Sequence, residues 1–158
     1  MGLSYALAVT VYEVATSMIF ACGGGIVLDL GHPGRWFRPF GSGGNLDDRL
    51  LKPSVVDYLI RNRHSCVLWN AIPRDWDDPV AGLIVRWSNA QSLPWTLMVV
   101  HDLPTGAMDH LEHILDRTDA LGARFHQDFP PDCVPIRAGG IVLPIQNYVS
   151  STEESVRP

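Results

Sequence analysis

The sequence has little lysine and little cysteine. Lys52 is the only lysine beside eleven arginines, the formal net charge is −5, and no stretch gathers basic residues. Because nucleic-acid binding normally needs a Lys/Arg-rich face, we do not expect a nucleic-acid partner. The three cysteines, Cys22, Cys66 and Cys133, are far apart and show no CxxC spacing. This pattern indicates neither a disulfide framework nor a zinc–cysteine site.

Charge is also scarce at the start of the chain, where residues 1–24 carry only Glu13. A signal peptide would begin with positive charge, and an acidic residue in the middle of a membrane segment is costly. We therefore expect an apolar helix of uncertain role over residues 1–24 and no membrane partner. A targeting segment is the alternative, and the weak signal-like character favours a cytoplasmic location over export. The polar residues 150–158 predict a disordered tail.

Between these ends, apolar runs alternate with helical periodicity. Buried strands are predicted at residues 35–40, 65–70 and 95–101, with shorter strands at 123–125 and 134–145. Helices are predicted at residues 53–62, 79–88 and 106–121, the last ending at Gly122. Such alternation is typical of α/β folds with a parallel sheet, in which sites form at the carboxyl ends of strands.

Three of the six histidines lie in the segment VVHDLPTGAMDHLEHILD, residues 99–116. His101 directly follows an apolar strand, so we expect it at the carboxyl end of a sheet. Histidine ordinarily titrates near neutral pH and is suited to proton transfer. A structural role for this histidine in the core or at a cap is the alternative.

His110 and His113 are three residues apart on the predicted helix. The side of this helix that faces the sheet is expected to contain Ala107, Leu111, Ile114, Leu115, Thr118 and Leu121. The two histidines then lie on the flank and on the opposite side, and their spacing differs from the four-residue spacing of HExxH metal sites. We expect a solvated helix face here, with a metal site as the alternative.

Three segments together resemble the later motifs of the NodB-homology polysaccharide deacetylases. RWFRPFG (residues 35–41) is similar to the arginine motif of that family, and WNAIPRDW (residues 69–76) to its W-x-x-D-x-x-D-W motif. VVHD (residues 99–102) is similar to its L-x-H-D motif. The motifs occur in the family's order, and the resemblance covers residues 35–126.

The resemblance implies the roles of the site residues. His101 would be the general acid that protonates the leaving group, Asp75 would orient its imidazole, and Arg38 would fix the carboxylates of the site. It places three residues in the substrate pocket: Trp76, Val99 and Pro39. The implied fold is α/β, a partial (β/α) barrel over residues 25–149 with its N-terminal strands missing or replaced. Its open strand edges would favour a homo-oligomer.

The sequence departs from the family at the metal site. Ile72 stands where an aspartate is common, and the TFDDG and H-[ST]-x-x-H motifs are not found. The family commonly uses a divalent metal such as zinc, but no cofactor ligands are identifiable here. The resemblance implies a shortened hydrolase that removes acetyl groups, by amide or ester cleavage, from a carbohydrate. A non-catalytic carbohydrate-binding module and a metal-independent amidohydrolase acting on a small amide are the alternatives.

Overall fold

The computed structural model describes residues 4–10, 25–27, 35–39, 42–78, 93–101, 106–126 and 128–151, with only the backbone of 4–10 and 25–27. Cys22, residues 11–24 of the expected first helix, the expected helix at 79–88 and residues 152–158 lie outside these ranges. The chain divides into two compact units: residues 1–15 with 69–133, and residues 16–68 with 134–158. Among the described residues, no helix has the length and apolar character needed to cross a membrane.

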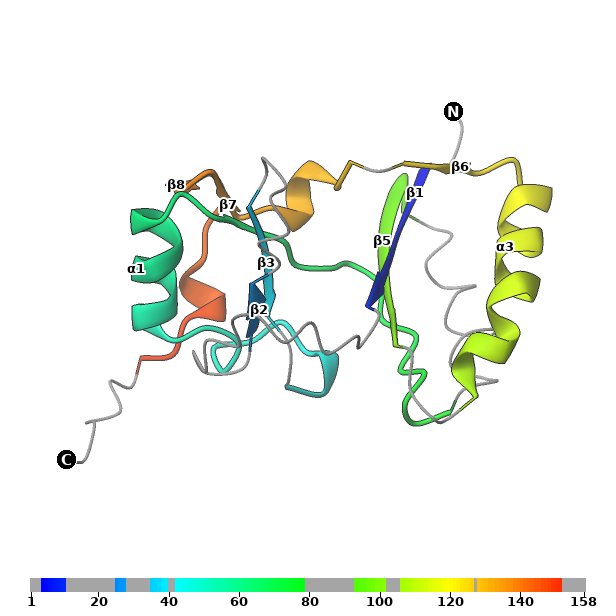
Figure 1. Ribbon diagram of the computed structural model, residues 1–158, viewed down its shortest axis with the longest axis horizontal. Coiled ribbons are helices and arrows are strands. Elements are labelled where there is room, and N and C mark those ends of the chain that lie inside the picture. The colour runs from blue at the N-terminus through cyan, green and yellow to red at the C-terminus, as the bar shows by residue number, and fades with distance from the viewer. Residues whose placement is uncertain are drawn as a thin grey trace. The chain divides into compact units, whose positions relative to one another are not determined.

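The first unit contains a parallel sheet in the order β5–β1–β6 (Figure 1). Its described elements are β1 (Ser4–Thr10), β5 (Trp95–His101), the 3₁₀ helices η2 (Ala107–His110) and η3 (Pro131–Cys133), α3 (Leu111–Ala120) and β6 (Arg124–Phe125). The segment Ser4–Thr10 is therefore a strand and not part of a helix as expected. All seven of its residues pair with β5, and this pairing stabilises the extended form.

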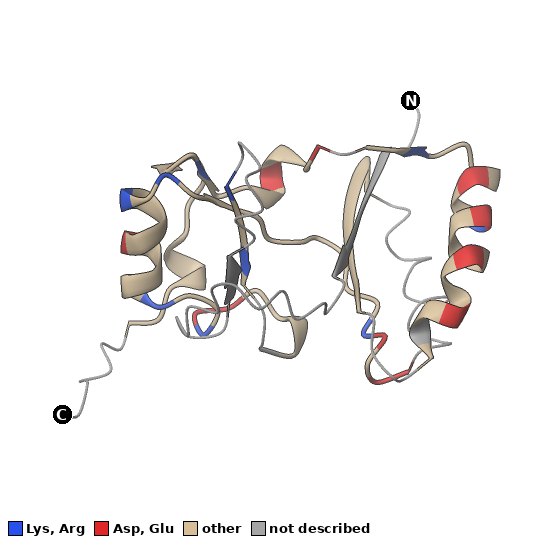
Figure 2. Ribbon diagram, in the orientation of Figure 1, with Lys and Arg blue, Asp and Glu red and all other residues tan. Residues whose placement is uncertain are grey.

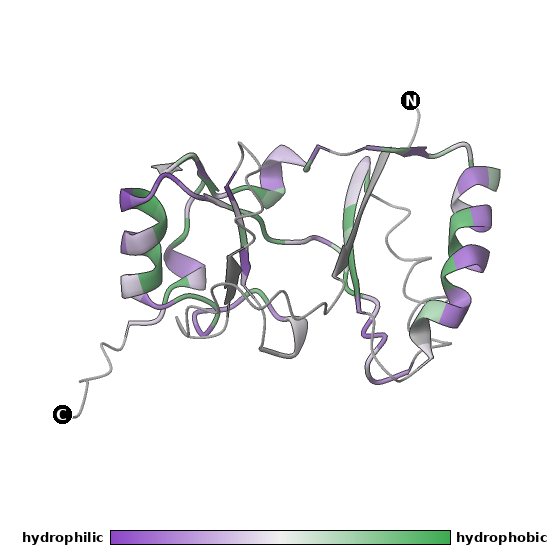
Figure 3. Cartoon of the chain, viewed as in Figure 1, coloured by the Kyte–Doolittle hydropathy of each residue, from purple (hydrophilic) through white to green (hydrophobic). Residues whose placement is uncertain are grey.

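The core of this unit lies between β5 and α3. Met98 and Val100 of β5 form a buried cluster with Ile114, and Ala71 and Met108 pack against it. Figure 3 shows one hydrophobic and one hydrophilic side on α3, as its periodicity predicts. Leu121, expected on the buried side, is 47% exposed, because the helix has ended at Ala120 and the chain turns at Gly122 with φ +70°.

The second unit contains a mixed sheet in the order β2–β3–β4–β7–β8. Its described elements are β2 (Gly25–Val27), β3 (Trp36–Pro39), η1 (Ser42–Gly44), α1 (Pro53–Arg61), β4 (Ser65–Cys66), β7 (Ile136–Arg137), β8 (Gly140–Ile141) and η4 (Gln146–Tyr148). Only β3 and β4 pair in parallel; the other pairs are antiparallel. The predicted helix at 53–62 is confirmed by α1, which buries Val55, Val56 and Leu59.

The apolar run at residues 65–70 is expected to be one strand. In the structure, its first residues belong to the second unit and its last residues to the first. Its first two residues form β4, and the Val67 N–H donates a backbone hydrogen bond to the Phe37 carbonyl oxygen of β3. Asn70 and Ala71 instead bond to Leu97 of β5. Residues 65–69 of the run are buried, and Asn70 is half-buried.

Neither unit presents a closed barrel among its described strands. The expected partial (β/α) barrel and the expected domain over residues 25–149 stay predictions.

Candidate active site

β5 ends at His101, which confirms the expected place of this histidine at the carboxyl end of a parallel strand. Thr10, the last residue of β1, is its register partner, so two strand ends meet here. The apolar residues 97–100 are buried, whereas the His101 side chain is 20% exposed. The buried strand thus ends in one ionisable side chain that is partly exposed.

Asn70 fixes the segment that leads to Asp75 along the edge of β5. Its Nδ2 donates to the Trp95 carbonyl oxygen at 3.0 Å, and its Oδ1 accepts from the Leu97 N–H at 2.7 Å. The amide side chain therefore bonds to β5 as a peptide group of a neighbouring strand would. A further parallel bridge joins Ala71 to Met98. Because the segment runs parallel to β5, Asp75 reaches the level of His101.

Asp75 and His101 form a two-point contact. The His101 Nδ1 lies 3.0 Å from Asp75 Oδ1, and the His101 backbone N–H donates to Asp75 Oδ2. The Asp75 side chain is fully buried, so its charge depends on these donors for compensation. The Asp75 carboxylate therefore binds both the imidazole ring and the backbone N–H of His101, and this fixes the orientation of the ring.

Trp76 completes this group. Its ring meets that of His101 edge to face, with centroids 5.0 Å apart and an interplanar angle of 87°. Arg74, just before Asp75, has a φ of +56°, a backbone conformation that residues other than glycine rarely adopt. Such strained positions are common where a chain must present particular side chains. The turn at residues 74–76 therefore aims two consecutive side chains, Asp75 and Trp76, at His101.

The arrangement can transfer protons. When the His101 Nδ1–H is donated to the Asp75 carboxylate, the proton-exchanging position of the ring is Nε2. No described residue is bonded to this nitrogen. An aspartate that orients a histidine and stabilises its charged form is the arrangement used in many acid–base sites.

The structure brings together three of the predicted site residues, Asp75, Trp76 and His101. Val99 is 5% exposed on the same strand as His101, and its predicted role in a pocket stays a prediction. Arg38 and Pro39 lie on β3 in the other unit, and their predicted roles also stay predictions.

The structure describes His113 as exposed and His110 as half-buried on the helical segment that follows β5. No three His, Cys, Asp or Glu side chains among the described residues could hold a metal ion together. The described residues thus offer no ligand set for the divalent metal that the deacetylase resemblance implies, its ligands stay unassigned, and we derive no step through a metal.

The sequence predicts Asn70 at the end of a strand, but it does not predict that the Asn70 side chain bonds to the backbone of β5. The signal was available: an amide directly after a buried run often replaces a missing backbone partner. A second buried polar residue, His64, gave no signal in the sequence, because its surroundings come from segments distant along the chain.

No protein-family model matches the chain, and no match to it is found among curated proteins or solved structures.

Proposed function

We propose that this protein is a hydrolase that removes acetyl groups from a carbohydrate, with His101 as the residue that protonates the leaving group. The observation that carries the proposal is the two-point contact between the buried Asp75 and His101. It fixes the ring, and Nδ1 is engaged while Nε2 is left for proton exchange. A buried carboxylate that serves a single, partly exposed histidine is well suited to general acid–base work.

The proton transfers balance as follows for an acetamide. Water adds to the carbonyl carbon as one of its protons passes to Nε2, and the Asp75 carboxylate stabilises the imidazolium. The Nε2–H is then donated to the amide nitrogen as the C–N bond breaks. Acetic acid and the free amine are released, and the imidazole is neutral again. An ester follows the same sequence with an alkoxide oxygen as the leaving atom.

The carbohydrate is proposed from the sequence resemblance to polysaccharide deacetylases, whose later motifs supply Asp75, Trp76 and His101 in the same order. The aromatic ring of Trp76 beside the histidine supports this choice, because such a ring can bury the apolar methyl of an acetyl group.

The test is acetate release from an N-acetylated chitooligosaccharide and from acetylated xylan. His101→Gln keeps a neutral polar side chain but cannot act as a general acid, so we expect the rate to fall by about 100-fold or more. Asp75→Asn leaves the histidine without its charge partner and should also lower kcat strongly. His113→Gln is the matched control, because it removes an exposed histidine from the same unit.

Equal acetate release by the wild type and His101→Gln would overturn the proposal. No acetate release, together with carbohydrate binding that weakens in Trp76→Ala, would instead identify a non-catalytic binding module. A second assay after chelator treatment separates metal-dependent from metal-independent hydrolysis, because a metal-independent amidohydrolase keeps its rate.

A further inference from the structure

Ala71 pairs with β5 as a residue of a regular parallel strand would. The Ala71 N–H donates to the Leu97 carbonyl, and the Val99 N–H donates to the Ala71 carbonyl, both at 3.2 Å. Successive hydrogen bonds of a parallel ladder are evenly spaced along each strand. A regular ladder would therefore continue two residues further along both strands, with a bond between the His101 N–H and the Pro73 carbonyl.

The ladder does not continue in this way, because the chain turns at Arg74. The His101 N–H donates to the side-chain Oδ2 of Asp75 and not to a carbonyl. The acceptor thus comes two residues later in the chain than a regular ladder would place it. The turn takes up the extra length, since the Arg74 carbonyl accepts hydrogen bonds from the N–H groups of Asp77 at 3.0 Å and Asp78 at 3.3 Å.

The backbone of Arg74 directs this turn. Its φ of +56° has the opposite sign to that of an extended strand, so the chain leaves the line of β5 at this residue. The Cβ of arginine disfavours this conformation, which the two backbone hydrogen bonds and an ion pair from Arg74 Nε to Asp77 Oδ2 at 3.9 Å accompany. Figure 2 shows the turn as a basic position followed by acidic positions near the carboxyl end of β5.

We propose that Arg74 is a positioning residue, whose left-handed backbone keeps Asp75 bound to His101. With residue 74 extended, the Pro73 carbonyl would take the His101 N–H, and Asp75 would lie beyond the end of β5. The imidazole would then lose its carboxylate partner. This role in the contact follows from the geometry alone, whereas its effect on catalysis rests on the proposed hydrolase function.

Substitutions at residue 74 separate the backbone from the side chain. Arg74→Gly removes the ion pair with Asp77 but adopts positive φ readily, so we expect it to keep the contact. Arg74→Val favours the extended conformation and should lose the contact. Arg74→Ala tests the same point with a smaller side chain if Arg74→Val does not fold. Arg63→Val is the matched control, because Arg63 also has a positive φ, +57°, but lies in the other unit.

The measurement is the ¹⁵N–¹H spectrum of the histidine rings in the full chain, with His101→Gln used to assign the His101 signals. A neutral ring that donates to Asp75 carries its proton on Nδ1, whereas a released ring interconverts between its two tautomers. We expect the Nδ1–H form in the wild type, Arg74→Gly and Arg63→Val, and a mixture in Arg74→Val. Circular dichroism checks that each variant is folded.

Activity gives a second readout. Arg74→Val should lower kcat by about tenfold or more, because a displaced Asp75 no longer orients the histidine. Adding Asp75→Asn to Arg74→Val should lower kcat little further, since a positioning residue acts through Asp75.

Acetate release and the ring spectrum fail separately. Without acetate release by the wild type, the hydrolase proposal fails and the spectrum alone decides the role of Arg74. Retention of the Nδ1–H form in both Arg74→Val and Arg74→Ala, its loss in Arg74→Gly, or an equal loss in Arg63→Val would overturn the proposal.

Discussion

Asp75 is fully buried, and both of its carboxylate oxygens are engaged by a single residue, His101. A substitution at position 101 that moves the backbone therefore leaves the buried Asp75 carboxylate without hydrogen-bond donors. The resemblance to the deacetylase motifs implied the pairing of these two residues. It could not predict that the backbone N–H of His101 takes part, because backbone contacts leave no trace in residue identity.

A second residue-scale feature is the two-residue turn between β7 and β8. Ala138 and Gly139 both have positive φ, and Arg137 pairs with Gly140, as in a type I′ hairpin. Glycine suits its position, since a Cβ there would lie 2.6 Å from the Ile60 carbonyl oxygen. Alanine does not, because its Cβ disfavours the left-handed region.

We therefore predict that Ala138→Asn stabilises the protein by about 0.5–1 kcal/mol, because asparagine is favoured at this turn position. The backbone N–H that bonds to Ser65 is retained. Urea denaturation followed by circular dichroism measures the change. Ala138→Val is the opposing variant, since a β-branched side chain is disfavoured at positive φ, and greater stability of Ala138→Val than of the wild type would contradict the explanation.

Cys66 on β4 is completely buried, and burial raises the pKa of its thiol to about 12. The unfolded thiol ionises near pH 9, so between pH 9 and 12 the unfolded state has lost a proton that the folded state keeps. Stability from this group is therefore complete below pH 9 and is lost as the pH rises toward 12.

We predict that raising the pH from 8 to 10 lowers the free energy of unfolding by about 1 kcal/mol through Cys66. Urea denaturation of the wild type and Cys66→Ala at both pH values isolates this contribution. The variant is less stable at pH 8 but should lose less stability between the two pH values. Equal losses in the two proteins would contradict the assignment. Cys133, whose thiol pKa burial also raises to about 12, retains its own contribution in both.

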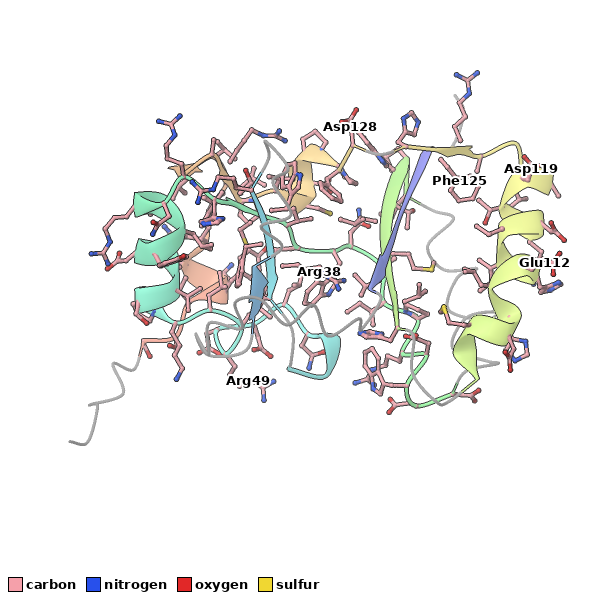
Figure 4. All side chains as sticks on the ribbon, in the orientation of Figure 1. Arg38, Arg49, Glu112, Asp119, Phe125 and Asp128 are labelled. Atoms are coloured by element: carbon pink, nitrogen blue, oxygen red, sulfur yellow. The ribbon has the colours of Figure 1, made fainter. Side chains whose placement is uncertain are left out.

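At the scale of elements, α1 and α3 agree well with the prediction from the sequence. Periodicity and an early proline placed α1, and the apolar stripe with Gly122 placed the helix that ends at Ala120. In Figure 4, Glu112 and Asp119 extend from the side of α3 away from β5, as expected for a solvated face. The strand Ser4–Thr10 was mistaken for a helix, because an apolar run has no period that distinguishes a buried strand from a buried helix.

Asn70 attaches the segment that carries Asp75 to β5. We predict that Asn70→Leu lowers the free energy of unfolding by about 2–4 kcal/mol, since the Leu97 N–H and the Trp95 carbonyl both lose their partner. The acetate-releasing activity should fall as well, because Asp75 is then less firmly held beside His101.

The matched control is Asn62→Leu at the end of α1, where, among the described residues, the Asn62 Nδ2 donates one hydrogen bond, to the Tyr58 carbonyl. Urea denaturation should show a smaller loss there, near 1 kcal/mol. An equal loss in both variants would mean that the contacts of Asn70 with β5 contribute no more than an ordinary helix-end bond.

At the scale of the whole molecule, the described strands are grouped into two sheets, and the expected alternation of strands and helices does not predict this grouping. A run such as residues 65–70 has the same composition whether it stays in one sheet or passes to another.

The interleaving of the two units also bears on the order of events during synthesis. β1 is made before its partner β5, and β4 can pair with β3 but lacks its second neighbour until β7 follows near the end of the described chain. Neither sheet can therefore be completed while its first strands are leaving the ribosome. Pairings between such distant segments slow folding and leave strand edges open in the meantime. We infer that a nascent chain of this protein has to be protected from aggregation until both units can close.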